Sequence, residues 1–253
     1  MVRIRTKREI ELIAISCQIV SDTLDMLSDH VKAGVKIIDL DKMAEEFIIN
    51  CGARPAFKGY MGFPATLCVS VDDEVVHGIP NDRILKDGQI VGIDCGAEKD
   101  GYFGDHARTF SVGKITNDKQ KLMDITHKSL MLGIAEARPD NYVSDIGYAI
   151  QSYVEKYGYS VVRELVGHGI GTELHEEPQI PNYGEPKQGY RLREGMCIAI
   201  EPMINLGSKE VKTDSDGWTI RTLDGQASAP FEHTIAITSN GPRILSQRDN
   251  VNG

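Results

Sequence analysis

The sequence predicts an α+β protein made of two related halves, in which an antiparallel sheet is covered by helices and a pseudo-two-fold axis relates the halves. One observation is a repeated strand motif: residues 87–94 read DGQIVGID and residues 194–201 read EGMCIAIE, each an apolar run that ends in a carboxylate. Another is a helical pattern in 39–48 that recurs in 145–154. The offsets are 107 and 106 residues, so one duplication accounts for both. The third is the turn at 100–101 between two β-rich runs, which predicts an antiparallel hairpin.

Helices are expected at the start of each half. Thr6 and Glu9 have the spacing of a capping box, and apolar residues follow at helical intervals as far as Leu27. A second helix is expected from about 39 to 50, with Gly52 just beyond it as a stop signal. In the second half, helices are expected to begin near residues 117 and 143.

Strands are expected after the helices in both halves. Residues 66–71 alternate like a strand, and 90–94 and 107–112 form the two arms of the hairpin. The second half repeats the scheme, with strands near residues 161, 197, 219 and 234. We interpret the chain as one domain, 1–253, whose halves cover about 1–115 and 116–253.

Composition and charge narrow the class of protein. The chain has 26% charged and 41% apolar residues, as ordinary globular proteins do. A net charge of -9 argues against a broad nucleic-acid surface, and the basic residues at 3, 5, 7 and 8 are interpreted as a helix start. Five cysteines, an odd number without CxxC pairing, indicate a reduced compartment. With neither a signal peptide nor a membrane-spanning run, we expect a cytoplasmic protein without membrane contact.

Four carboxylates at matched places in the two halves predict a metal site. Asp94 and Asp105 flank the hairpin turn at nearly equal distances, so we expect them on one face of the ladder and close to opposite each other. Glu201 and Glu232 are their counterparts in the second half. A pair of solvated edge acids is the alternative interpretation. Apolar neighbours such as Ile93 argue against it, because burying like charges requires compensation.

One histidine is expected to complete this set. His168 lies in a glycine-rich run that lacks the GxGxxG spacing of a nucleotide loop, and glycines allow close backbone approach to a site. His175 begins HEEPQ, in which Gln179 rules out the HExxH zinc motif. Four carboxylates and one imidazole neutralise two divalent ions, and this oxygen-rich set suits manganese, iron(II) or cobalt, with zinc also possible. A paired-metal site with a bridging hydroxide is machinery for amide hydrolysis.

Together these motifs resemble those of the type I methionine aminopeptidases over almost the whole chain. The matching segments are VHGIP at 76–80, GID at 92–94, GDHART at 104–109, GHGIG at 167–171, HEEP at 175–178, IEP at 200–202 and EHT at 232–234. The resemblance implies the duplicated pita-bread fold. It also implies a dinuclear-metal aminopeptidase that removes the initiator methionine from nascent polypeptides when the second residue is small, with a metal-bridging hydroxide attacking the first peptide bond.

The resemblance also implies a role for each site residue. Asp94 would bind one metal, Asp105 and Glu232 would bridge both, and His168 and Glu201 would complete the other. The catalytic residues would be as follows: Glu201 would accept the proton of the attacking water, His77 would hydrogen-bond the substrate near the scissile amide, and His175 would stabilise the oxygen of the tetrahedral intermediate.

The pocket for the substrate methionine is expected at matching apolar and aromatic positions, which are Tyr60, Phe63, Cys68 and Trp218, together with His77 and His175 as substrate-binding residues. From the residues alone, Trp218 is equally interpretable as core packing and His77 as a turn histidine. Phe63 and Leu174 depart from the tyrosine and phenylalanine frequent in the family. Both keep the wall apolar, and they put the shape of the subsite for the second residue in doubt.

Three other interpretations compete with this one. An Xaa-Pro aminopeptidase or prolidase shares the fold, although such enzymes usually carry a further N-terminal domain. A non-catalytic binding module of the same fold normally lacks some metal ligands, and here all five are present. A cation-binding protein without chemistry leaves His77 and His175 without a role. For partners we expect nascent polypeptides with N-terminal methionine, at most a transient ribosome contact, no nucleic-acid specificity and a monomeric state.

Overall fold

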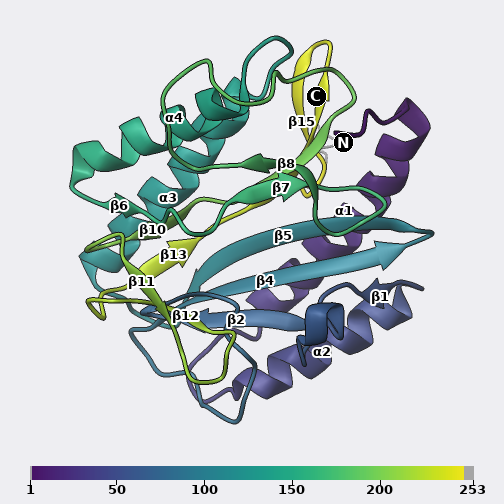
Figure 1. Cartoon of the computed structure of the whole chain (residues 1–253). Helices are drawn as coiled ribbons and strands as arrows, with labels where there is room; N and C mark the ends of the chain where they lie inside the picture. The colour runs from purple at the N-terminus through teal and green to yellow at the C-terminus, as the bar shows by residue number, and fades with distance from the viewer. Residues whose placement is uncertain (1, 248–253) are drawn as a thin grey trace, which may run out of the picture.

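The computed structural model describes residues 2–247 and contains four α-helices and two short 3₁₀ helices within that range (Figure 1). The α-helices are α1 (Lys7–Ser28), α2 (Ile37–Asn50), α3 (Asn117–Glu136) and α4 (Val143–Val154), and the 3₁₀ helices are η1 (Tyr60–Gly62) and η2 (Glu155–Tyr157). The strands are β1 (Arg54–Pro55), β2 (Leu67–Val71), β3 (Glu74–Val76), β4 (Ile90–Lys99), β5 (Tyr102–Ser111), β6 (Ser160–Val161), β7 (Gly167–Gly169), β8 (Glu176–Ile180), β9 (Cys197–Ile200), β10 (Met203–Asn205), β11 (Val211–Thr213), β12 (Ile220–Thr222), β13 (Ser228–Pro230), β14 (His233–Thr238) and β15 (Gly241–Ile244).

The helices begin close to where the sequence predicts. The Thr6 side chain accepts a hydrogen bond from the Glu9 amide and the Glu9 side chain accepts one from the Thr6 amide, so the predicted capping box is confirmed. Helix α2 begins two residues before the expected start, because Arg83 and Asn81 provide backbone carbonyls for the amides of Ile37 and Ile38. That loop contact replaces a side-chain cap. The sequence pattern alone does not reveal the contact.

The hairpin of β4 and β5 is longer than predicted and runs without a break to its turn. Asp100 and Gly101 both have positive φ, as a two-residue turn of this kind requires. This turn pairs Asp94 with Ala107 and places Asp105 opposite Gly96. The two aspartates therefore share a face, as predicted, but they are diagonal neighbours; the expectation that they lie close to opposite each other is wrong by two residues.

The predicted antiparallel strands are divided among several sheets in residues 2–247, and every pairing is antiparallel. One larger sheet has the order β1-β4-β2 with β5 beside β4, and the other has the order β15-β14-β9-β7-β8. Two small sheets have the orders β13-β10-β6 and β11-β12-β3. The ladder breaks at Pro202, since proline has no amide hydrogen to donate. It also breaks after Pro230, where the Phe231 amide donates to the Pro202 carbonyl and the Glu232 amide to the Ala107 carbonyl.

Each half has its own core, and backbone bonds join the two. Leu24 and Leu40 are buried with β2 and β4 in one core, while Leu122 and Ile146 are buried with β9 in another. The Glu232 amide donates to the Ala107 carbonyl, 2.9 Å away, across the boundary. These contacts support the proposal that both halves form one domain. Among residues 2–247, no helix is both long and apolar enough to cross a membrane.

Candidate active site

Four carboxylates converge between the two larger sheets. Asp94 and Asp105 project from β4 and β5, whereas Glu201 follows β9 directly and Glu232 precedes β14 directly. Hydrogen bonds hold the backbone at these points: the Thr234 hydroxyl donates to the Asp105 carbonyl at 2.8 Å. The sequence motifs that end in charge therefore meet at one place, although they lie more than a hundred residues apart in the chain.

These carboxylates lack compensation from protein groups. Asp94 Oδ1, Asp105 Oδ1 and Glu232 Oε1 are buried and have no hydrogen-bond partner among the described residues. Burial raises the pKa of Asp94 to about 7. Burial and the neighbouring carboxylates raise the pKa of Asp105, Glu201 and Glu232 well above their usual range. Four such acids cannot all be ionised at neutral pH unless a positive charge is supplied.

The ligand atoms are close enough together to hold cations. Ligand atoms lie within 4.8 Å of one another in a set of Asp105, His168 and His175 and in two sets that each contain at least two carboxylates: Asp94, Asp105 and Glu232 form one of these two, and His168, Glu201 and Glu232 form the other. Glu232 belongs to both sets, and the oxygens without partners lie in them. The residues present therefore fit two adjacent divalent ions.

His168 is prepared to act as a neutral ligand. Its Nδ1 lies 2.9 Å from its neighbour's carbonyl at Gly169, so Nδ1 carries the hydrogen and Nε2 presents a lone pair. Nε2 lies 3.6 Å from Glu201 Oε1. Burial, together with His175, lowers the pKa of His168 to about 3, which keeps the imidazole neutral. A Cβ on Gly167 would lie 2.3 Å from the Ala199 carbonyl oxygen, so glycine is needed here for strand β7 to approach β9.

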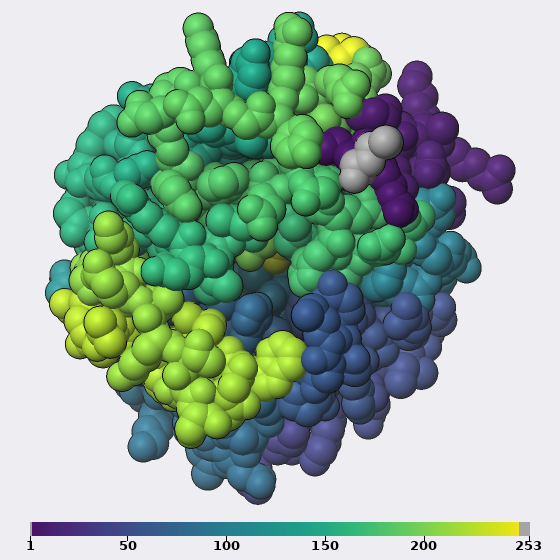
Figure 2. Space-filling view, in the orientation of Figure 1, coloured from purple at the N-terminus to yellow at the C-terminus, as the bar shows by residue number. Residues whose placement is uncertain are grey.

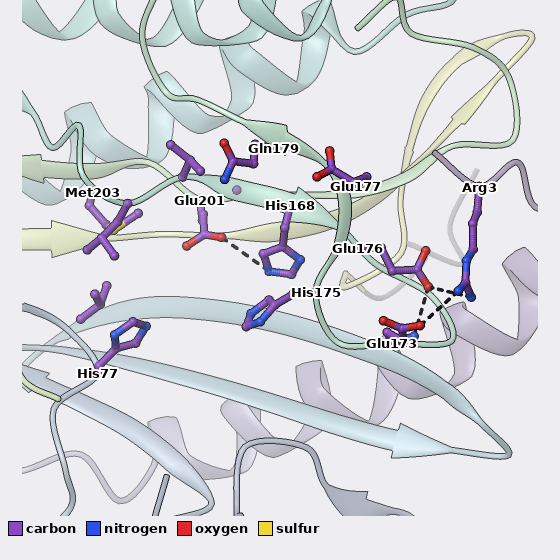
Figure 3. Close-up of a pocket in the computed structure, with 14 residues that line it drawn as sticks. Arg3, His77, His168, Glu173, His175, Glu176, Glu177, Gln179, Glu201 and Met203 are labelled. Carbon is purple, nitrogen blue, oxygen red and sulfur yellow. Dashed lines mark hydrogen bonds and ion pairs between the residues drawn. The ribbon is translucent and has the colours of Figure 1, made fainter. Parts of the chain in front are cut away.

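His77 and His175 face the same space from opposite sides (Figure 3). His77 has a φ of 57°, a strained conformation for a residue with a side chain, and such strain is concentrated at functional sites. His175 Nδ1 lies 3.0 Å from the Tyr60 hydroxyl, and its ring is packed edge-on against His168 at 4.3 Å. Burial lowers the pKa of both His77 and His175, so both are neutral hydrogen-bonding groups at pH 7.

His106 and His233 lie away from the proposed ligands, as expected for residues that follow a carboxylate on a strand. Their rings stack at 4.5 Å, and His106 is hydrogen-bonded to the Glu232 carbonyl through Nδ1. The Arg108 Nε donates to His106 Nε2 at 2.8 Å. His106 thus supports the backbone of a proposed ligand from the opposite face of the sheet, and His233, which is hydrogen-bonded to the Ser246 hydroxyl, stacks against His106.

An apolar cavity opens onto the carboxylates. Its volume is about 160 Å³, enough for on the order of five water molecules at about 30 Å³ each, and thus for a single long side chain. Its apolar and aromatic lining comprises Phe57, Tyr60, Met61, Phe63, Cys68, Leu174 and Trp218. The Phe63 and Trp218 rings are in edge-to-face contact at 5.2 Å. All four predicted pocket residues line it, and Phe57 and Met61 are additions; the only sequence signal for Met61 is its place between Gly59 and Gly62.

A wider cleft extends from the same site to the surface. It has a volume of about 570 Å³ and shares His77, His168, His175 and Glu201 with the apolar cavity. Figure 2 shows a hollow in the middle of this face, bordered by blue, green and yellow-green segments from both halves. The smaller cavity holds one side chain, and the cleft leaves room for a chain that continues beyond it.

Comparison with known proteins identifies the class. Residues 11–239 match the model of metallopeptidase family M24. The chain therefore belongs to metallopeptidase family M24, and it is a metal-dependent hydrolase of peptide bonds. Both the orphaned buried carboxylates and the duplicated fold agree with this membership.

Within that family the chain belongs with the methionine aminopeptidases. It is 51% identical to methionine aminopeptidase 1 of Bacillus subtilis over 247 residues, which cover 98% of this chain and 100% of that protein. A crystal structure of methionine aminopeptidase from Thermotoga maritima matches with a TM-score of 0.97 and 42% identity, over 98% of this chain and 100% of that one.

A prolidase shares the fold at a greater distance. The prolidase from Pyrococcus furiosus matches with a TM-score of 0.80 and 25% identity, over 98% of this chain and 66% of that one. Both results support the pita-bread fold expected from the sequence, and they favour the aminopeptidase interpretation over the Xaa-Pro one.

Proposed function

We propose that this enzyme removes the N-terminal methionine from nascent polypeptides whose second residue is small. The observation that carries this proposal is the meeting of two features in one site. One is a cluster of four carboxylates, three of which have a buried oxygen without a hydrogen-bond partner, and the other is an apolar cavity with space for one side chain. The carboxylates provide hydrolytic chemistry, and the cavity limits it to a substrate with one long apolar side chain beside the scissile bond.

Five residues would hold the metal ions. Asp94 would bind one ion, Asp105 and Glu232 would bridge both, and His168 with Glu201 would complete the other; cobalt, manganese, iron(II) and zinc all suit this set. When bound, two divalent cations polarise a carbonyl and lower the pKa of water so that it attacks at neutral pH.

The remaining steps belong to side chains of this chain. Glu201, the proposed ligand most exposed to the cleft, would accept the proton of the attacking water. His77 would hydrogen-bond the substrate near the scissile amide. His175 would donate through Nε2 to the oxygen that gains charge in the tetrahedral intermediate, since its Nδ1 is paired with the Tyr60 hydroxyl.

The substrate would lie across both hollows. Its methionine side chain would fill the cavity around Phe63 and Trp218, and the chain beyond the second residue would follow the wider cleft. Phe63 is 4% exposed and Leu174 1% exposed, so both belong to the closed wall of the cavity. The limit on the second residue would be set where cavity and cleft meet, between His77 and His175.

Peptide cleavage by the metal-stripped protein tests this proposal. Manganese, iron(II), cobalt or zinc would be added back one at a time, with Met-Gly-Met-Met, Met-Leu-Met-Met and an Xaa-Pro tripeptide as substrates. We expect cleavage of the first peptide alone, and only with metal. Preference for the Xaa-Pro peptide would move the protein to the prolidase branch, and tight metal binding without turnover would indicate a binding module.

The expected setting of the reaction is part of this proposal. We propose that it takes place in the cytoplasm, a reducing compartment in which the free cysteines found among residues 2–247 would stay as thiols. A monomeric state and a transient ribosome contact stay predictions.

A further inference from the structure

The N-terminal segment reaches the loop that carries His175. This segment, residues 2–5, precedes α1, and its Arg5 amide donates to the Gly195 carbonyl at 2.8 Å. Figure 3 shows Arg3 beside Glu173 and Glu176, at the end of the cleft that also contains His175. A basic run that the sequence suggests is only a helix start is thus placed against the proposed catalytic site.

Arg5 and Glu176 form a buried ion pair. Their side chains are 5% and 7% exposed, and the Arg5 Nη2 donates to both carboxylate oxygens of Glu176. A Cβ on Gly171 would lie 2.2 Å from the Arg5 Nη2, so the guanidinium occupies the space that a side chain at 171 would need. A buried pair of this kind is costly to break, because the remaining charge must find water.

Glu176 in turn organises the loop before it. Its Oε1 accepts hydrogen bonds from the Thr172 amide at 2.9 Å and from the Glu173 amide at 3.1 Å. The loop closes on itself through the Gly171 amide, which donates to the Glu173 carbonyl at 3.2 Å. The two residues between these anchors and Glu176 are Leu174, in the cavity wall, and His175.

We propose that Arg5 is a positioning residue for the peptidase reaction: by holding Glu176, it fixes the loop 171–176 that presents His175 to the substrate. The inference rests on the proposed role of His175. Arg5 does not contact the substrate or the metal ligands; it acts through the loop.

A double-mutant cycle with Arg5→Met and His175→Ala tests the inference, with kcat and KM measured on Met-Gly-Met-Met in the metal-loaded enzyme. His175→Ala should lower kcat by roughly 10²–10³-fold, the effect of losing one donor to the developing oxyanion. Arg5→Met should lower kcat by about tenfold or more with a smaller change in KM, since misplacing a catalytic group by about 1 Å costs up to about 10². In the His175→Ala background the same substitution should change kcat by less than about threefold, because the group it positions is gone.

Other variants separate positioning from general stability. Gly171→Ala keeps both charges and places a methyl group against the guanidinium, whose atoms are the three nearest to the added Cβ, so it should reproduce the loss in kcat. It also serves if Arg5→Met does not fold. Arg243→Met is the matched control, since Arg243 pairs with Glu11 on α1, away from the loop, and kcat should not change. Cobalt affinity by calorimetry should be unchanged in Arg5→Met and Gly171→Ala, since the proposed ligands are untouched.

The outcomes distinguish this inference from the proposed function. Full activity of His175→Ala would remove the proposed role of His175, and the inference with it. If His175→Ala is inactive but both Arg5→Met and Gly171→Ala have a normal kcat, the inference about Arg5 is overturned and the proposed function is not affected. An equal loss from Arg5→Met in both backgrounds would also overturn it, because the effect would then not pass through His175.

Discussion

Each half of the chain brings a pair of carboxylates to the same site, but the local backbone structure around the carboxylates differs between the halves. Asp94 lies inside a continuous ladder, with Cys68 of β2 on one side and Ala107 of β5 on the other. Glu201 lies in the gap between β9 and β10, where Pro202 interrupts the sheet. The carboxylates therefore keep matching positions in the two repeats, but the backbone that holds them differs between the halves.

This difference separates a fixed side of the site from a more open one. The aspartate side chains are short, and both start from residues within paired strands; Asp94 lies on β4, which is paired on both edges. The glutamates have one more methylene and start at breaks in the sheets. Glu201 also borders the wider cleft, where water and substrate enter. The proposed proton acceptor, Glu201, is thus on the open side, and the proposed ligands Asp94 and Asp105 are on the fixed side.

The largest effect is expected on the open side. Glu201→Gln keeps the shape of the side chain and removes the proposed base, so kcat should fall by roughly 10²–10⁴-fold. Cleavage of Met-Gly-Met-Met with cobalt measures the change, and Glu194→Gln, in the same repeat motif, is the control. Near-normal turnover in Glu201→Gln would contradict the proton-accepting role.

Metal affinities of ligand variants test whether His168 and Asp94 bind different ions of the pair. His168→Ala should weaken one ion by about 100-fold or more, since losing even an indirect contact to a ligand costs about 10–100-fold. Asp94→Asn should weaken the other ion. Calorimetric titration of metal-stripped protein with manganese resolves the two steps. If both variants weaken both ions equally, the proposed division of ligands is wrong.

In the metal-free protein, the pH dependence of stability should show how much free energy of unfolding is lost when the buried carboxyl groups ionise. Burial raises the pKa of Asp94 to about 7 from 3.8, so the folded state binds its proton more tightly than the unfolded state does. Stability from this group is therefore complete below about pH 4 and is lost as the pH rises towards 7. Without metal, the Tm of the parent chain should fall as the pH rises from about 4 to 7, and the Tm of Asp94→Asn should fall less. Each kcal/mol of difference in stability corresponds to roughly 2–4 °C in Tm. An identical pH profile for both proteins would contradict the inferred burial cost.

Strand β7 on the glutamate side should tolerate no side chain at Gly167. Gly167→Ala places a methyl group against the Ala199 carbonyl and should cost about 1–3 kcal/mol of stability, as overpacking does. Gly158→Ala is a useful comparison: its φ is 77° but nothing lies within 4 Å of the added Cβ, so it tests backbone strain alone. Urea unfolding measures both. A loss in Gly167→Ala no greater than in Gly158→Ala would mean that β7 and β9 can separate freely.

The smallest effect is expected in the apolar wall. Phe63→Tyr restores the residue frequent in relatives and adds one hydroxyl beside Trp218. The ratio of kcat/KM for Met-Gly-Met-Met over Met-Val-Met-Met should change by a factor of only a few, which is the scale of small changes in an apolar pocket. A change above about 100-fold would show that Phe63 is the main determinant of second-residue selectivity.

Much of this protein is determined by sequence periodicity and by where charge is placed. The capping box at Thr6, the starts of α3 and α4 and the shared face of Asp94 and Asp105 follow from local patterns, because helices and hairpins are set by nearby residues. The carboxylates at matched positions predict a metal site from burial cost alone. The resemblance adds the family and the expected role of each residue.

Tertiary structure decided what depends on distant segments. The early start of α2 depends on the backbone carbonyls of Asn81 and Arg83, and the Glu232 amide leaves its own sheet to bond the Ala107 carbonyl of the other half. Met61 enters the cavity lining, and Arg5 meets Glu176, across 171 residues of chain. No local pattern encodes such contacts, since they arise only when both cores have formed and bring their edges together. Sequence patterns predict which groups perform the chemistry, whereas the packing of the two halves decides which groups hold them in place.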